Sequence, residues 1–252
     1  MRGSSVGLFV VCGLGIAIMT GCQGAGPKVD VSIVGMSVEG RPIQCRVLGD
    51  GPRTVLLMAT IHGDENVGTP LLRDLEIYLK HKPRLLDGRT VVLMPVANPD
   101  GYAHNTRHNV HGVDLNRNFP ADNFDASAVH GSAPLCEPES RAIKQVLDQH
   151  RPAAIVSIHQ PYGVLDYDGP GEALAAAMAA HCDLPVKRVG SRPGSLGSYA
   201  GLTLGVPIIT LELPRSADLL GAEGRWQRYG RALLAAVLYP EPVGREVDLS
   251  SR

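Results

Sequence analysis

The stretch Val55-Leu56-Leu57-Met58-Ala59-Thr60-Ile61-His62-Gly63-Asp64-Glu65-Asn66 decides how this chain folds. Its first five residues are apolar without alternation, which is typical of a strand covered on both faces. The polar residues that follow indicate a tight turn, and a helical period begins near Val67. His62 and Glu65 stand three residues apart in that turn. Because imidazole nitrogen and carboxylate oxygen both bind zinc well, the stretch offers two of the three protein ligands that a catalytic zinc needs.

The segments around this stretch predict an α/β fold. Strands are expected over 29–38, 41–48, 55–59, 90–96, 153–158 and 206–213, and helices over 67–80, 137–149, 171–181 and 225–239. Strands that alternate with helices favour a mixed sheet. Ligands of such sheets bind outside the carboxyl ends of the strands, which is where His62, His159 and Glu212 fall. The polar run 98–123 shows no period, and loops of that length usually carry function.

The composition limits the classes of protein to which this chain can belong. The chain has 252 residues, 44% of them hydrophobic and 19% charged, which suits one globular domain, expected over 30–240. The net charge of -1 argues against nucleic-acid binding by bulk electrostatics. With 4% aromatic residues, a stacking platform for bases or sugars is not expected.

Residues 1–22 read as a lipoprotein-type signal peptide. The apolar run Val6–Met19 has 14 residues, fewer than the ~20 of a spanning helix. Thr20-Gly21-Cys22 resembles a lipobox, so Cys22 would be lipidated and would be the only link to a membrane. A plain cleaved signal or an uncleaved anchor are the alternatives, and all three place the domain outside the cytoplasm. Gln23 favours the outer membrane, with the domain facing the periplasm.

The segments next to the domain are short. Residues 23–29 are expected to form a tether and residues 241–252 a tail. Three cysteines lie within the domain, namely Cys45, Cys136 and Cys182. One disulfide among them is possible in an oxidising compartment, and the sequence leaves the pair open.

Two further strand ends carry residues that suit metal chemistry. His159 follows the apolar run 155–158 and is the best third ligand. The alternatives are that His159 is a core histidine bonded to the backbone, or that a histidine of the polar loops is the ligand instead. Glu212 lies inside a β-run, where a carboxylate is costly unless it is paired or used. It is either a general base or the partner of an arginine such as Arg215.

The polar loop offers groups that bind anions. Arg117 has a planar fork suited to a carboxylate, and Asn116 adds a further donor. Arg107 would stabilise the oxyanion that forms during amide hydrolysis. The alternative for both arginines is a solvated surface position.

Together these motifs resemble the zinc carboxypeptidase family. The resemblance spans about 31–239 in family order, through Gly40–Ile43, the HxxE of His62 and Glu65, Asn98–Tyr102, Gly112–Pro120, His159 and Thr210–Leu213. It implies a single domain around an eight-stranded mixed sheet flanked by helices.

The resemblance also implies roles for individual residues. His62, Glu65 and His159 would bind one zinc ion per chain, and Glu212 would activate the water. Arg107 would polarise the scissile carbonyl, while Asn116 and Arg117 would hold the free C-terminal carboxylate of a short peptide. The expected activity is that of a metallocarboxypeptidase, and a monomer is expected.

Within that family the chain looks closest to bacterial murein peptide amidases, which split the γ-D-glutamyl–diaminopimelate bond. Gly194–Ser198 supports this placement. Digestive members carry a mobile tyrosine where this chain has Val189–Pro193, and Tyr199 is left without a role. Leu196 or Gly197 should lie near the pocket for the substrate side chain.

Two other functions stay open at this stage. One is a deacylase of N-acyl amino acids, a related branch with a similar HxxE. The other is a wall-binding lipoprotein without turnover. Asn98–Gly101 and the strand Thr210–Glu212 favour the amidase over the deacylase. Glu212 argues against the binding protein, because a binding protein has no need of a costly strand carboxylate. Export would place the activity on wall peptides outside the inner membrane.

Overall fold

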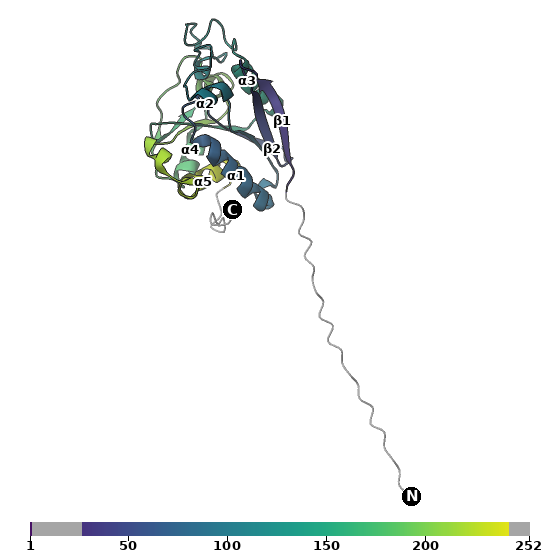
Figure 1. The fold of residues 1–252 in the computed structure, drawn as a ribbon. Coiled ribbons are helices and arrows are strands. Elements are labelled where there is room, and N and C mark those ends of the chain that lie inside the picture. Colours follow the sequence, from purple (N-terminus) through teal and green to yellow (C-terminus); the bar gives the residue numbers. More distant parts are fainter. Residues whose placement is uncertain (2–26, 242–252) are drawn as a thin grey trace.

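An eight-stranded mixed sheet forms the centre of the computed structural model, which describes residue 1 and residues 27–241 (Figure 1). The strands are β1 (Val29–Met36), β2 (Pro42–Leu48), β3 (Arg53–Ala59), β4 (Arg89–Met94), β5 (Ala154–His159), β6 (Val164–Asp168), β7 (Val186–Lys187) and β8 (Ile208–Glu212). They lie in the order β1-β2-β4-β3-β5-β8-β6-β7. The predicted α/β class and eight-stranded sheet are confirmed. Apart from residue 1, the predicted signal peptide lies outside the described residues, as do most of the tether and the tail.

Four neighbouring strands, β4, β3, β5 and β8, run parallel. Strand β2 pairs antiparallel with β4, and β6 pairs antiparallel with β8. Every residue of β5 is buried, as expected for a strand that lies between two covered faces. Because the four strands run in one direction, the residues at their carboxyl ends meet at one edge of the sheet.

Helices cover both faces of the sheet. They are α1 (Gly68–His81), α2 (Pro99–His104), α3 (Pro138–His150), α4 (Glu172–Ala179) and α5 (Ala222–Leu238). Helices α1, α4 and α5 lie together, whereas α3 lies beside β1 (Figure 1). The ring of Trp226 on α5 is fully buried and lies 5.2 Å from the ring of Tyr78 on α1, centroid to centroid. Such a pair adds about 0.5–1.5 kcal/mol beyond the burial of its area.

Among the strands and α-helices of the described residues, three short elements were not predicted. Helix α2 lies in the run 98–123 that was expected to be irregular, and six residues are too few to show a helical period. Asn98 caps it by accepting a hydrogen bond from Gly101 N at 2.9 Å, and Pro99 occupies its first turn. Strands β6 and β7 are the other two. Both are short, and β7 has only two residues.

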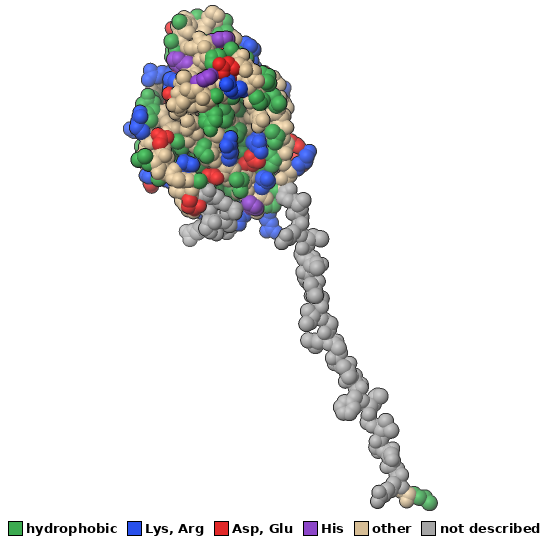
Figure 2. Space-filling view, viewed as in Figure 1, with side chains coloured by type: hydrophobic (Ala, Val, Ile, Leu, Met, Phe, Trp, Pro, Cys, Tyr) green, Lys and Arg blue, Asp and Glu red, His purple; other side chains and the backbone are tan. Residues whose placement is uncertain are grey.

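Cys45, Cys136 and Cys182 are free thiols, so they form no disulfide with one another. Within the described part of the chain, no helix is long and apolar enough to cross a membrane. On the face shown in Figure 2, basic, acidic and apolar side chains are interspersed, in keeping with the net charge of -1.

Candidate metal and peptide-binding site

The turn after β3 contains a strained backbone conformation, which its neighbours hold in place. Thr60 has a φ of 56°, which costs a β-branched residue about 1–3 kcal/mol unless its surroundings fix it. Its hydroxyl lies 2.8 Å from that of Thr69, and its carbonyl accepts from Asn98 N at 2.9 Å. A Cβ on Gly63 would come within 1.9 Å of the Gly101 carbonyl carbon. Only glycine therefore lets this turn lie against α2.

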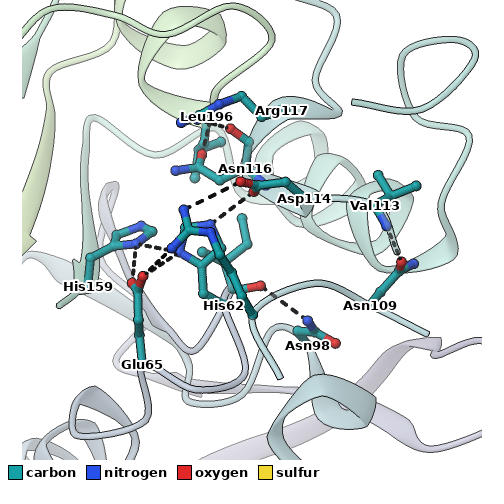
Figure 3. Close-up of polar contacts among 12 residues, drawn as sticks. His62, Glu65, Asn98, Asn109, Val113, Asp114, Asn116, Arg117, His159 and Leu196 are labelled. Atoms are coloured by element: carbon teal, nitrogen blue, oxygen red, sulfur yellow. Dashed lines mark hydrogen bonds and ion pairs between the residues drawn. The ribbon is translucent and has the colours of Figure 1, made fainter. Parts of the chain in front are cut away.

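Three side chains converge from this turn and from the end of β5. His62 Nδ1 lies 3.0 Å from Glu65 Oε1, and His159 Nδ1 lies 2.9 Å from Glu65 Oε2. The two Nδ1 atoms are 3.2 Å apart. All three residues are buried, and one ligand atom from each lies within 4.8 Å of the others (Figure 3). Two imidazoles and a carboxylate in this arrangement form a group that can hold a metal ion.

The Nε2 atom of each imidazole, which lies away from the three-residue group, has a hydrogen-bond partner. His62 Nε2 lies 2.9 Å from Asp114 Oδ1, and His159 Nε2 lies 2.9 Å from the Ser157 hydroxyl. When His62 Nε2 donates its proton to Asp114, Nδ1 keeps its lone pair for a metal. Asp114 was part of a motif in the sequence analysis but had no role there. Its contact with His62 joins residues 52 positions apart, and no local pattern reports such a contact.

Two carboxylates of the site keep a low pKa although they are buried. Burial raises the pKa of Glu65, but hydrogen bonds from His159 and His62 outweigh this and hold it well below its usual range. Burial also raises the pKa of Asp114, and the hydrogen bond from His62 reverses the effect. Burial lowers the pKa of His62, yet its bonds to Asp114 and Glu65 bring it above the ordinary value. Both carboxylates therefore stay charged at neutral pH.

Arg107 lies beside this group. Its Nη1 donates to Glu65 Oε1 at 2.6 Å, and its Nη2 lies 3.4 Å from Asp114 Oδ2. With 41% of its side chain exposed, it also lines the neighbouring cavity. It is therefore held at the site, and the alternative of a freely solvated arginine is not what the structure shows.

Glu212 is the register partner of His159 in the parallel pair β5–β8. Burial is the main reason why its pKa lies above the ordinary value. Its Oε2 atom is buried without a hydrogen-bond partner in the described chain. Arg215 is exposed and forms no ion pair with it among residues 27–241. A carboxylate with one buried oxygen that has no partner in the described chain, beside a metal-type site, fits a proton acceptor.

A cavity of about 510 Å³ connects these groups. Asn116 and Arg117 line it together with the two histidines. The Asn116 oxygen accepts from Leu196 N at 2.9 Å, which leaves its amide nitrogen as a donor (Figure 3). Arg117 Nη1 donates to the Asn116 carbonyl at 2.5 Å. All seven residues singled out from the sequence line this one cavity, namely His62, Glu65, Arg107, Asn116, Arg117, His159 and Glu212.

Other side chains near the cavity were assigned less well from the sequence. Gly197 lines it, whereas the Leu196 side chain is 1% exposed and belongs to the core. Tyr199 is buried and stacks on Phe119, with ring centroids 6.2 Å apart. Tyr162, which is 75% exposed, is the tyrosine that lines the cavity. The missed lining residues Asp166 and Asp168 lie on β6, the strand that the sequence did not reveal.

The sequence matches the family model of the zinc carboxypeptidases over residues 17–168. This match covers more than half of the chain, and the chain belongs to the zinc carboxypeptidase family. It is therefore a hydrolase of the metallocarboxypeptidase type, and the family implies zinc. The match includes His62, Glu65 and His159 and ends before Glu212.

Individual proteins of known name are also similar to this chain. The chain is 35% identical over 177 residues to murein peptide amidase A of Escherichia coli, covering 63% of this chain and 70% of that protein. It is 25% identical over 185 residues to γ-D-glutamyl-L-diamino acid endopeptidase 1 of Lysinibacillus sphaericus, covering 54% and 47%. The solved structure of murein-tripeptide amidase MpaA from Escherichia coli O157 superposes with a TM-score of 0.62 at 28% identity, covering 88% of this chain and 96% of that one.

Proposed function

We propose that this chain hydrolyses the amide bond before the last residue of short cell-wall peptides, with γ-D-glutamyl–diaminopimelate as the bond cleaved. One observation carries the proposal. His62, Glu65 and His159 converge on one wall of a cavity whose other walls present a proton acceptor and a pair of carboxylate-binding donors. The names of the relatives support the choice of a wall peptide.

The metal group of the proposal is His62, Glu65 and His159, which would hold one zinc ion. The residues fit that ion, because two neutral imidazoles and one carboxylate form a catalytic zinc donor set. Asp114 and Ser157 orient the imidazoles so that both Nδ1 atoms face inward. When bound, zinc supplies Lewis acidity, which makes water more acidic and polarises a carbonyl.

The remaining residues act on the peptide and its protons. Glu212 accepts a proton from the attacking water and returns it to the leaving amine, as its unpaired and buried Oε2 suits it to do. Arg107 donates to the oxyanion of the tetrahedral intermediate. Arg117 and the Asn116 amide bind the terminal carboxylate, which makes the enzyme an exopeptidase.

We further propose that the protein works outside the cytoplasm as a monomer. The sequence of residues 1–22 supports export, with lipidation at Cys22 and the domain facing the periplasm. Mass spectrometry of the N-terminal peptide from native membranes tests this, because a diacylglyceryl Cys22 is expected as the first residue. An unmodified peptide that begins upstream of Cys22 would contradict it.

The activity is tested by incubating the purified, zinc-loaded protein with defined muropeptides and reading the products by mass spectrometry. We expect loss of the C-terminal diaminopimelate residue, and we expect a chelator to abolish it and added zinc to restore it. A panel of N-acyl amino acids run in parallel tests the deacylase. Hydrolysis of that panel alone, or binding of muropeptides without any product, would refute the proposal.

A further inference from the structure

One face of strands β1 and β2 is exposed at the edge of the sheet. The β1 side chains Val31, Ile33 and Met36 lie on it and are 51%, 63% and 48% exposed. Their three register partners on β2 line a groove of about 670 Å³. Paired residues point to the same side of an antiparallel pair, so these apolar side chains and the groove form one surface, the β1–β2 face. Val34 on the opposite face is buried, where α3 contacts β1.

Helix α1 extends the β1–β2 face with a stripe of exposed residues. Arg73, Ile77 and Lys80 lie three or four positions apart and are all exposed, so they share one side of the helix. Arg73 and Ile77 line the groove beside β2. Because α1 connects the parallel strands β3 and β4, it runs opposite to them, whereas β1 runs in their direction. The carboxyl end of α1, where Lys80 lies, therefore points toward the start of β1 (Figure 1).

Two cations of this surface have no acidic partner among the described residues. Neither Arg73 nor Lys80 takes part in any of the ion pairs formed within residues 27–241. Arg46 donates from Nε and Nη2 to Glu76 at 2.5 and 3.1 Å, so this pair adds little net charge. The other titratable groups of β1, of α1 and of the turn between β1 and β2 are Asp30, Glu39, Arg41, Asp74, Tyr78 and His81. Arg73 and Lys80 are therefore available to an anionic partner.

The segment before β1 limits what can lie near this surface. Six residues separate Cys22 from Val29, and they span at most roughly 25 Å when fully extended. Strand β1 has eight residues and is itself roughly 26 Å long. Lys28, which precedes it, is 86% exposed and pairs with Asp30, which is 66% exposed. A lipid on Cys22 therefore holds the start of the β1–β2 face within that distance of a bilayer.

We infer that the β1–β2 face and the exposed stripe of α1 dock on the bilayer that anchors the chain. The inference rests on the proposed lipidation of Cys22. The apolar side chains of β1, together with Ile77, enter the boundary between headgroups and acyl chains. Arg73 and Lys80 bind the phosphates of anionic lipids. An exposed edge strand with apolar side chains invites association with another chain, and the bilayer covers it instead.

Docking through β1 leaves the catalytic cavity open. Strand β1 is first in the sheet order, whereas β8 and β6 are sixth and seventh and carry Glu212 and Asp166, which line the cavity. At about 4.8 Å for each step between strands, β6 lies roughly 29 Å from β1. The cavity therefore stays accessible to wall peptides while β1 rests on the bilayer.

The test uses the mature full chain in vesicles of phosphatidylethanolamine and phosphatidylglycerol that contain a photoactivatable phospholipid. Mass spectrometry maps the residues that the lipid labels. We expect labels on β1 and on the exposed stripe of α1, roughly tenfold or more above the label on Leu219. Leu219 is a fair reference, because it is 87% exposed and lies after β8. In vesicles of phosphatidylcholine the label should fall, because the two cations then meet no anionic lipid.

Variants connect docking to this surface. Arg73→Glu changes the charge by two, which should weaken docking roughly 25-fold at about fivefold per charge. Ile33→Glu puts a charge among the apolar side chains and should also lower the label on β1. Both positions are exposed and lie outside the catalytic cavity, so hydrolysis of soluble muropeptides and thermal melting should stay unchanged. Leu219→Glu is the matched control and should leave the pattern of labels intact.

Three results would overturn the inference. They are equal labelling of Leu219 and β1, a pattern of labels that survives both Arg73→Glu and Ile33→Glu, and a dimer in sedimentation whose interface protects β1. None of these measurements needs turnover, so a failure of the proposed hydrolysis leaves the docking assignment untouched.

The N-terminal peptide separates docking from the anchor. If its mass shows no lipid, flotation of the same mature chain with the anionic vesicles tests the surface alone. Flotation that is lost in Arg73→Glu would keep the docking assignment and reject the anchor. Absence of flotation, or a lipidated chain without preferred labels on β1 and α1, would reject the docking assignment.

Discussion

Asp114→Asn is the sharpest perturbation that the site offers, because it changes one oxygen to NH₂ without changing the size of the side chain. The carboxylate accepts on both sides. Its Oδ1 faces His62 Nε2 at 2.9 Å and Asn116 N at 2.9 Å, and its Oδ2 faces Arg107 at 3.4 Å. An asparagine has a single oxygen, so one orientation points NH₂ at the guanidinium and the other points it at His62. Neither orientation satisfies all the donors.

The size of the effect follows from burial. His62 is 2% exposed, so water does not replace the lost charge-assisted bond. Such bonds contribute about 1.5–3 kcal/mol, and loss of the partner of a ligating histidine typically weakens metal binding 10–100-fold. A factor of ten in affinity corresponds to about 1.4 kcal/mol, so a 10–100-fold weakening corresponds to about 1.4–2.8 kcal/mol. This range agrees with the range given for the lost hydrogen bond. We therefore expect the Kd for zinc to rise 10–100-fold in Asp114→Asn.

The assay is competition for zinc against a chelator of known affinity, followed by kcat/KM at saturating zinc. Asp148→Asn serves as the control, because Asp148 pairs with Lys144 on the surface. Activity at saturating zinc should recover only in part, since Arg107 has also lost a partner. A zinc Kd within twofold of the parent protein, together with full activity, would show that Asp114 does not orient His62.

The remaining predictions concern the base, a thiol and a turn. Glu212→Gln should keep the zinc content and lose 10²–10⁴-fold in kcat, and parental turnover in this variant would mean that another group takes the proton. Burial raises the pKa of Cys45 to about 12, so its thiol should resist iodoacetamide in the folded protein at pH 9 and react once urea unfolds it. Rapid labelling of Cys45 before unfolding would contradict its burial, and mass mapping reports the site. Gly63→Ala should lower stability by about 1–3 kcal/mol and weaken zinc binding, because the added Cβ meets the Gly101 backbone. Gly224→Ala on α5 has no atom nearer than 3.6 Å to the new Cβ and should be neutral or stabilising by up to about 1 kcal/mol. Urea unfolding compares the two, and equal stabilities would count against the close contact at Gly63.

The sequence predicted the fold well where the signals lie within a single segment. The apolar runs that became β3, β5 and β8 report burial on both faces, and their parallel order brings the following residues to one edge. His62, His159 and Glu212 could be placed in one site for that reason. The family and its hydrolytic class were predicted from motifs in a fixed order and are confirmed. The individual roles of the site residues remain predictions until the variants are measured.

The sequence failed where an element is too short to show a period. Helix α2 has six residues and β7 has two, so neither stands out from the polar segments around it. The choice between Leu196 and Gly197 also stayed open, since adjacent residues share one local pattern. Only their packing shows that Leu196 enters the core while Gly197 lines the cavity.

By itself, the sequence determined which segments form strands and helices and which ligand types stand at the strand ends, because apolar period and turn chemistry are properties of neighbouring residues. The tertiary structure alone decided which groups meet across long separations. Asp114 reaches His62 from 52 residues away, and β6 brings Asp166 and Asp168 beside the strand of Glu212. These contacts depend on the register between distant strands and on how loops close over the sheet, and no period within a segment encodes either.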